Sequence, residues 1–213
     1  MKEIWWVRHG STDWNEEKRW QGYTDVPLNE RGRFEAECLA RRLRGIKFDG
    51  VWSSDLSRSM ETARIAVPGA AVHPDSRLRE IPMGVAEGHV WSELSASQQE
   101  LIEKWWSDPY GLKFPGANES LRDTEARLKE WRDELPDGRY LVFTHGGTMR
   151  CLMWEITGSP KGLAWTMELG NTGIIRARYD GDLKILVCFN DMSHMENYWE
   201  TQPAQNVPGA ANI

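Results

Sequence analysis

Two short apolar runs, each followed closely by a histidine, constrain the fold of this chain more than any other feature. Ile4–Val7 leads into Arg8-His9-Gly10, and Tyr140–Phe143 leads into Thr144-His145. Runs this apolar are typical of strands buried on both faces, as in a parallel sheet covered by helices. The carboxyl end of such a strand is where an open α/β sheet binds its ligand. We therefore expect His9 and His145 to meet in one pocket, although they lie far apart in the sequence.

Length and composition indicate one globular domain. The 213 residues, 40% of them hydrophobic and 27% charged, are enough to bury a substantial core. No stretch approaches the ~20 apolar residues that cross a bilayer, and the N-terminus lacks a signal-peptide pattern, so we expect a cytoplasmic protein that does not bind membranes. The net charge of -6 argues against a nucleic-acid surface. Cys38, Cys151 and Cys188 are too scattered for a metal cluster or a disulfide framework and are predicted to be buried.

The predicted elements alternate between strand and helix and end in a hairpin. Strands are expected at 3–7, 51–53 and 140–143, and helices from 28–30 to Gly45, from 54–55 to Pro68, and over about 91–106, 118–135 and 147–156. Residues 74–90 are predicted to form an ordered loop. Asp180-Gly181-Asp182 lies between two strand-like runs, 173–179 and 183–189, which is a strong hairpin signal. This order predicts an α/β fold with a mostly parallel mixed sheet covered on both faces.

An arginine accompanies the two histidines, because Arg58 follows Ser53-Ser54-Asp55 at a further strand end. Histidine can act as a covalent nucleophile, and the arginine fork suits phosphate. The pattern therefore predicts a cationic pocket for phosphoryl transfer. No histidine pair has the spacing of a zinc site, so a metal centre is not expected.

At these positions the chain resembles the histidine phosphatase superfamily, in its phosphoglycerate mutase-like branch. The matching stretches are Val7–Asn15, Gln21–Gly32, Ser53–Ser59, Leu78–Ile81, Glu87-Gly88 and Thr144–Gly147. Their order and spacing agree from residue 4 to about 157. The resemblance implies a three-layer α/β/α sandwich over residues 1–202, with a helical cap around 85–135. Residues 203–213 are rich in Pro, Gly, Ala and Asn and are expected to be flexible. It also implies metal-free phosphoryl transfer through phosphohistidine, without a cofactor.

In this resemblance His9 corresponds to the nucleophile, while Arg8, Arg58 and His145 form a clamp around the phosphate. To attack phosphorus, Nε2 of His9 must carry a lone pair, so Nδ1 should donate its proton to a backbone acceptor. Nearby arginines should keep His9 neutral. His145 is expected to be charged and to donate to a phosphate oxygen.

Glu80 corresponds to the proton donor of the family, and Glu87 is the rival acid. A carboxyl facing a phosphate dianion is more easily protonated, so Glu80 could give a proton to the departing alkoxide and later take one from water. We expect Glu87 to order a loop instead.

Further phosphate contacts are expected from loops of the pocket. The resemblance adds Asn15, Gln21 and Gly22 to the binding residues. Gly146 and Gly147 begin a helix, where backbone N–H groups can face an anion.

The other histidines and the tryptophans are predicted to be mainly structural. His73 should lie in a surface turn and His194 beside the site, whereas His89 is either a substrate contact or a loop residue. Of the twelve tryptophans, five near the predicted opening either form an apolar rim that selects bulky leaving groups or, as we favour, pack beneath the cap: Trp14, Trp20, Trp91, Trp105 and Trp106.

The sequence favours a phosphatase over a mutase. Glycolytic-type mutases of the family carry a long insertion before the helix that begins here near Glu119, and this chain lacks it. Ile81–Gly84 stands where those mutases have a basic-aromatic pair, although Glu119–Thr124 is similar to them. A 2,3-bisphosphoglycerate-dependent phosphoglycerate mutase, with that bisphosphate as primer, is therefore the alternative.

A third possibility, from another class, is a phospho-ligand binding or regulatory protein without catalysis, which the intact set of site residues disfavours. The expected substrate is a small phosphorylated metabolite: a sugar phosphate, a phosphoglycerate, or a nucleoside phosphate such as α-ribazole phosphate. Ala86 replaces an aromatic residue common in the family, which would widen the pocket. A monomer and a homodimer both fit the sequence.

Overall fold

A six-stranded mixed sheet carries the site. The computed structural model describes residues 1–158 and 163–195. The strands are β1 (Lys2–Arg8), β2 (Gly50–Ser53), β3 (Val72–Pro74), β4 (Gly138–Thr144), β5 (Ile174–Asp180) and β6 (Leu183–Asp191), in the spatial order β3-β2-β4-β1-β5-β6. β1, β2, β3 and β4 run parallel, and β5 pairs antiparallel with both β1 and β6. The predicted mixed sheet with a C-terminal hairpin is confirmed.

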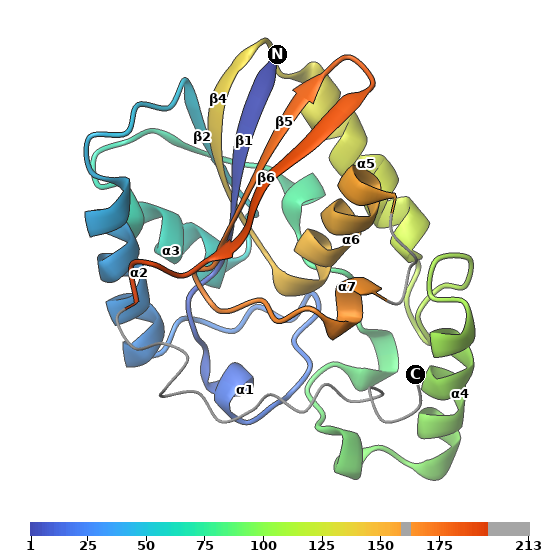
Figure 1. The fold of residues 1–213 in the computed structure, drawn as a ribbon. Coiled ribbons are helices and arrows are strands. Elements are labelled where there is room, and N and C mark those ends of the chain that lie inside the picture. Colours follow the sequence, from blue (N-terminus) through green and yellow to red (C-terminus); the bar gives the residue numbers. More distant parts are fainter. Residues whose placement is uncertain (159–162, 196–213) are drawn as a thin grey trace.

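Helices cover both faces of this sheet, which gives the predicted three layers. They are α1 (Asp13–Glu16), α2 (Glu30–Leu43), α3 (Ser57–Ala66), α4 (Ala96–Ser107), α5 (Leu121–Glu134), α6 (Gly146–Thr157) and α7 (Leu163–Thr166), with short 3₁₀ turns η1 (Ser76–Leu78), η2 (Gly84–Ala86) and η3 (Trp91–Glu93). α2 and α3 lie on one side of the sheet, α5 and α6 on the other (Figure 1). Within the described residues, no helix is both long and apolar enough to span a membrane.

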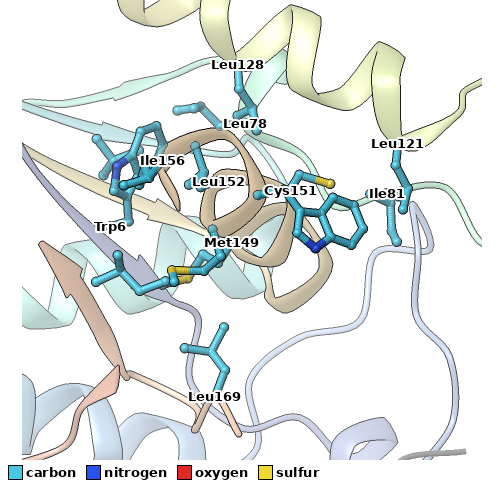
Figure 2. Close-up of a cluster of buried hydrophobic side chains, with 14 of the residues drawn as sticks. Trp6, Leu78, Ile81, Leu121, Leu128, Met149, Cys151, Leu152, Ile156 and Leu169 are labelled. Atoms are coloured by element: carbon cyan, nitrogen blue, oxygen red, sulfur yellow. The ribbon is translucent and has the colours of Figure 1, made fainter. Parts of the chain in front are cut away.

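Alternate side chains of β1 enter two separate cores. Trp6 packs with Leu128 of α5 and Leu152 of α6 in the cluster drawn in Figure 2. Trp5 points the other way and joins Leu39 of α2. Since a strand's side chains alternate between its faces, both faces of β1 are buried, as its apolar sequence predicted.

Two predictions about elements are wrong. The helix expected over 91–106 is divided into η3 and α4, because Ser95 and Gln98 form a capping box that begins a new helix. β3 was not expected, since only three residues pair with β2 and they read Val-His-Pro, without a strand period.

The cysteine prediction holds for two positions of three. Cys38 and Cys151 are buried, whereas Cys188 is half-buried, because it lies on β6 at the edge of the sheet. All three are free thiols. The predicted flexible tail at 203–213 lies outside the described residues.

Two glycines allow α2 to approach the loop that carries His9. A Cβ atom on Gly32 would lie 2.1 Å from the carbonyl oxygen of Ser11, and one on Gly10 would lie 2.5 Å from that of Gly32. The backbone N–H and the hydroxyl of Ser11 both donate to the buried carboxylate of Glu35, at 2.8 Å each. The first turns of α2 therefore fix the position of the loop after β1.

We predict that Gly32→Ala lowers the free energy of unfolding by about 3 kcal/mol, because the methyl group would displace the backbone at Ser11. The same shift would also move His9. Glu37→Ala, at an exposed position of α2, is the control and should change stability by no more than about 0.5 kcal/mol. Denaturant unfolding measures both variants; equal stabilities would contradict the proposed close packing.

Candidate active site

The register of the sheet brings the two histidines together. In the parallel pair of β1 and β4, Arg8 lies opposite Thr144. The next residues, His9 and His145, therefore leave the sheet side by side, and the His9 N–H donates to the Thr144 carbonyl at 2.9 Å. Their ring centroids are 5.1 Å apart, with an angle of 59° between the planes. The predicted meeting of His9 and His145 at the carboxyl ends of neighbouring strands is therefore confirmed.

His9 has the orientation that a nucleophile requires. Nδ1 lies 2.7 Å from the carbonyl oxygen of Gly10. A carbonyl can only accept, so Nδ1 carries the proton and Nε2 keeps its lone pair. Burial, followed by the charges of Arg58 and Arg8, holds the pKa of His9 well below its usual range. The ring is therefore neutral at pH 7 and able to attack an electrophile.

Burial and the charge of Arg58, which lower the pKa of His145 well below its usual range, favour a neutral ring in this structure. The predicted charged ring that donates to a phosphate oxygen concerns the complex with phosphate and stays a prediction. Nε2 forms a hydrogen bond of 2.8 Å with the hydroxyl of Ser54, which follows β2. Nδ1 is buried without a hydrogen-bond partner in the described part of the chain. A fully buried imidazole beside a guanidinium cannot keep a second positive charge without a nearby anion.

Arg58 lies in the first turn of α3 and is fully buried. Its two Nη groups donate to the carbonyl oxygens of Thr24 at 2.8 Å and Gly22 at 2.9 Å. Burial lowers its pKa to about 10, so it remains a cation at neutral pH. Gly22, predicted as a phosphate contact, has φ of 50° and directs its carbonyl at Arg58. In the structure Gly22 therefore orients a member of the clamp.

Arg8 approaches the same pocket from the end of β1. Its Nη1 donates to the carbonyl of Leu169 at 2.5 Å. A Cβ atom on Gly146 would lie 3.3 Å from Nε of Arg8, so the first residue of α6 packs against this guanidinium. The structure thus brings together Arg8, Arg58, His9 and His145, as predicted, with Gly146 at their edge.

The side-chain carboxylate of Glu80 lies at the N-terminus of α6. It accepts hydrogen bonds from the N–H groups of Gly147 at 3.0 Å and Thr148 at 2.9 Å. A helix N-terminus favours a negative charge at this place. The expectation that the Gly147 N–H faces a phosphate is wrong, because Glu80 itself is the anion there.

Glu87, the rival acid, orders two loops. One carboxylate oxygen accepts from the N–H groups of Tyr23 at 3.1 Å and Met83 at 3.0 Å, and the other from the N–H and hydroxyl of Thr24. These contacts hold the loop that supplies two carbonyls to Arg58. They agree with the expected role of Glu87 as a loop-ordering residue.

Asn15 and Gln21, which were predicted to bind phosphate, differ in their hydrogen bonds. The side-chain oxygen of Asn15 accepts from the backbone and hydroxyl of Thr12 at 3.1 Å, which caps α1. Its amide NH₂ is the part that could reach a phosphate. Gln21 is buried, and its Oε1 has no hydrogen-bond partner among the described residues. Asn171, which the sequence did not single out, donates to the carbonyl of His9 at 3.0 Å.

The remaining histidines lie outside the pocket formed by His9 and His145. His73 is exposed, as expected, but it lies on β3 and not in a turn. His194 forms a hydrogen bond of 2.9 Å with Thr172, and burial lowers its pKa to about 4. His89 binds the backbone carbonyl of Glu87 at 3.0 Å through Nδ1, which favours a role in the loop over substrate contact.

The tryptophans near the predicted opening pack mainly against other aromatic rings. Trp105 is only 3% exposed and lies edge-on to Trp106. Trp20 contacts Trp91 and Phe114 in the same way. Trp14 lies against the Gly88 loop. These contacts agree with a packing role, while the alternative of an apolar rim stays a prediction, because the four indoles other than Trp105 are half-buried.

Two arginines at the site were not predicted from the sequence. Arg127 of α5 donates to the backbone carbonyl of Glu80 at 3.0 Å and pairs with Glu119 at 2.9 Å. Arg150 of α6 lies beside Arg8: its Nη1 is 3.7 Å from the Cβ position of Gly146. A charged residue on a helix usually marks a solvated face, so nothing in the sequence distinguished these two. Within the described residues, no group of three or more His, Cys, Asp or Glu side chains could hold a metal ion.

Comparison with known proteins gives consistent matches over nearly the whole chain. Residues 4–192 match the model of the histidine phosphatase superfamily (branch 1). Phosphoglycerate mutase-like protein 4 of Arabidopsis thaliana is 36% identical over 204 residues, covering 91% of this chain and 87% of its own. A mutant phosphoserine phosphatase of Entamoeba histolytica, crystallised with phosphoserine, has a TM-score of 0.81 at 26% identity, covering 92% of this chain and 100% of its own. A mycobacterial glucosyl-3-phosphoglycerate phosphatase has a TM-score of 0.78 at 27% identity, covering 89% and 99%.

We predict that acid destabilises the protein through its buried imidazoles. The pKa of His145 is lower in the fold than the ordinary value of about 6.5 in the unfolded chain. Its stabilising contribution is therefore complete above pH 6.5 and is lost as the pH falls, by up to about 1.4 kcal/mol per pH unit. In His145→Gln, the decline in unfolding free energy between pH 6.5 and 5 should be shallower by that amount. Identical slopes in denaturant titrations would contradict a neutral His145.

Proposed function

Since this chain belongs to the histidine phosphatase superfamily, we propose that it is a metal-independent phosphomonoesterase that works through a phosphohistidine on His9. One observation carries the proposal: His9 is buried and neutral, its Nδ1 is held by Gly10, and its Nε2 is left free among Arg8, Arg58 and His145. The substrate is a small phosphorylated metabolite.

In the first step, Nε2 of His9 attacks the phosphorus atom, and the bond from phosphorus to the ester oxygen breaks. A bound phosphate dianion favours protonation of the Glu80 carboxylate. Glu80 then gives this proton to the ester oxygen, so the product leaves as an alcohol. Arg8 and Arg58 hold the equatorial phosphate oxygens and stabilise the charge that spreads over them. Nδ1 of His145 is buried without a partner in the described part of the chain, and a phosphate oxygen would supply one.

In the second step, a water molecule attacks the phosphohistidine. Glu80, now a carboxylate, takes a proton from that water, and the new bond from oxygen to phosphorus replaces the bond to Nε2 of His9. Inorganic phosphate leaves, and both residues return to their starting state. The hydrogen bonds from Gly147 and Thr148 hold the Glu80 carboxylate in place during this second role.

Structural neighbours support a phosphatase more than a mutase. The two solved structures reported above are named as phosphatases, of phosphoserine and of glucosyl-3-phosphoglycerate. The mutase-like helix start at Glu119 has a structural explanation, because Glu119 binds Arg127 and the hydroxyl of Tyr23 at 2.9 Å each. Those contacts fix the loop of Glu80 and need no second phosphate. The mutase alternative is kept because the Arabidopsis relative carries a mutase-like name.

We predict that the purified protein hydrolyses p-nitrophenyl phosphate equally well with and without a chelator. His9→Ala should abolish turnover, by at least about 10³-fold, because the nucleophile is lost. His73→Ala, which removes an exposed histidine, should leave the rate unchanged. Release of p-nitrophenolate measures all three.

Other results of that assay would identify the alternatives. Loss of turnover with the chelator would point to a metal-dependent hydrolase. Binding of phosphate without turnover would favour a non-catalytic binding protein. Fast interconversion of 2- and 3-phosphoglycerate that depends on 2,3-bisphosphoglycerate would establish the mutase.

We predict that Glu80→Gln lowers the rate of hydrolysis of alkyl phosphates by about 10²-fold or more, because an alkoxide leaving group needs a proton. The effect on the first step with p-nitrophenyl phosphate should be much smaller, since its phenolate leaves unprotonated. Glu87→Gln should lower stability instead, with no dependence on the leaving group, because Glu87 holds loops. Burst kinetics with both substrates separate these cases; a leaving-group dependence in Glu87→Gln would reverse the assignment.

A further inference from the structure

Ser54 carries a buried hydroxyl that the proposed mechanism does not use. The residue follows β2, and its backbone N–H donates at 2.9 Å to the carbonyl of Phe143 in the neighbouring strand β4 (Figure 1). Its side chain is fully buried, and Oγ lies 2.8 Å from Nε2 of His145. Since Phe143 is two residues before His145, the pairing of β2 with β4 brings this hydroxyl to the imidazole.

The surroundings of Ser54 indicate which of the two groups donates. Oγ accepts a hydrogen bond of 3.3 Å from the N–H of Leu56, the residue before α3. Within the described residues, the hydroxyl forms hydrogen bonds with Leu56 and His145 and with no third group. If Nε2–H donated to Oγ, the hydroxyl proton would be buried without an acceptor, which is costly. The hydroxyl therefore donates, and Nε2 of His145 accepts.

This direction of the hydrogen bond places the proton of the neutral ring on Nδ1. Burial and the charge of Arg58 lower the pKa of His145 and favour the neutral ring, which has one donor and one acceptor nitrogen. Nδ1 is buried and has no hydrogen-bond partner in the part of the chain that the structure describes. Its N–H is thus an unused donor beside His9, whose ring centroid is 5.1 Å away. With the opposite tautomer, Nδ1 would present a lone pair and would repel a phosphate oxygen.

We propose that Ser54 is a positioning residue that acts through His145: its hydroxyl fixes the proton of the imidazole on Nδ1, so that this N–H is donated to a phosphate oxygen. The hydroxyl is itself held by the backbone before α3, the helix that carries Arg58. One oxygen atom thereby links two members of the phosphate clamp. A ring that gains a second proton in the phosphate complex keeps this orientation, because the same oxygen then accepts from Nε2. The inference rests on the proposed phosphatase function for the role of His145.

The first test measures the tautomer by nitrogen NMR on the protein without substrate, with the spectrum of His145→Gln to assign the ring. We expect the wild-type ring to carry its proton on Nδ1 at pH 7. In Ser54→Ala, Nε2 loses its donor, so the fraction of the Nδ1–H form should fall. Ser54→Thr keeps a hydroxyl and should keep the wild-type tautomer. A wild-type proton on Nε2, or a tautomer that does not change in Ser54→Ala, would overturn the inference.

Turnover is the second measurement. In Ser54→Ala, kcat/KM should fall about 10- to 100-fold, because one donor of the clamp is misdirected. The loss should be similar for alkyl and aryl phosphates, in contrast to Glu80→Gln, because the clamp contacts the phosphate oxygens and not the leaving oxygen. Ser59→Ala is the matched control, since Ser59 carries another fully buried hydroxyl, which accepts from Ser53 and does not contact His145. Its kcat/KM should change by no more than about 3-fold.

A double-mutant cycle separates this role from a purely structural one. In the His145→Gln background, Ser54→Ala should change kcat/KM by no more than about 3-fold, because the residue through which Ser54 acts is absent. An equal loss in both backgrounds would show that Ser54 only supports the fold, and would overturn the inference.

The tautomer also distinguishes this inference from the proposed function, because it is measured without turnover. A protein that hydrolyses no phosphomonoester would contradict the phosphatase proposal, while the comparison of wild type with Ser54→Ala would still decide whether Ser54 sets the proton of His145. An active enzyme with the proton on Nε2 would overturn the role of Ser54 and leave the phosphatase proposal intact.

Discussion

The site depends on burying a guanidinium against two neutral imidazoles. Arg58 is fully enclosed, and its donors meet the backbone carbonyls of Gly22 and Thr24 rather than a carboxylate. Its charge, together with burial, keeps His9 and His145 unprotonated. A cation held in this way is costly, and an arriving phosphate dianion lowers that cost. The same arrangement therefore makes His9 nucleophilic and makes the pocket selective for anions.

Carboxylates from separate parts of the chain position the loops around this site. Glu35 holds the loop after β1 through Ser11, Glu87 holds the loop that binds Arg58, and Glu119 acts through Arg127 on the backbone of Glu80. Each one accepts hydrogen bonds from fixed donors, which rigidifies a loop whose backbone would otherwise be free. Glu80 differs because its donors belong to the start of α6, directly beside Arg8 and Arg150.

Much of this arrangement was predictable from the sequence, and the errors have physical causes. The strands β1 and β4, the hairpin and the meeting of His9 with His145 followed from apolar runs and their polar ends. The lowered pKa of His145 could not be predicted, because it depends on complete burial and on the proximity of Arg58. The N–H of Gly147 was assigned to a phosphate, since the sequence does not show that a loop returns Glu80 to the same helix end. Cys188 was expected inside, but its strand lies at the sheet edge.

The sequence by itself determined most of the elements, the family and the identity of the residues that meet around His9, because apolar periodicity and short motifs are local properties of the chain. The tertiary structure alone decided the protonation of His9 and His145, the partner of Glu80 and the position of Arg150. These depend on burial and on distances between residues from separate elements. Arg150 in particular looks like a solvated helix residue until α6 is placed against Arg8 and Trp165, where its charge faces a second cation.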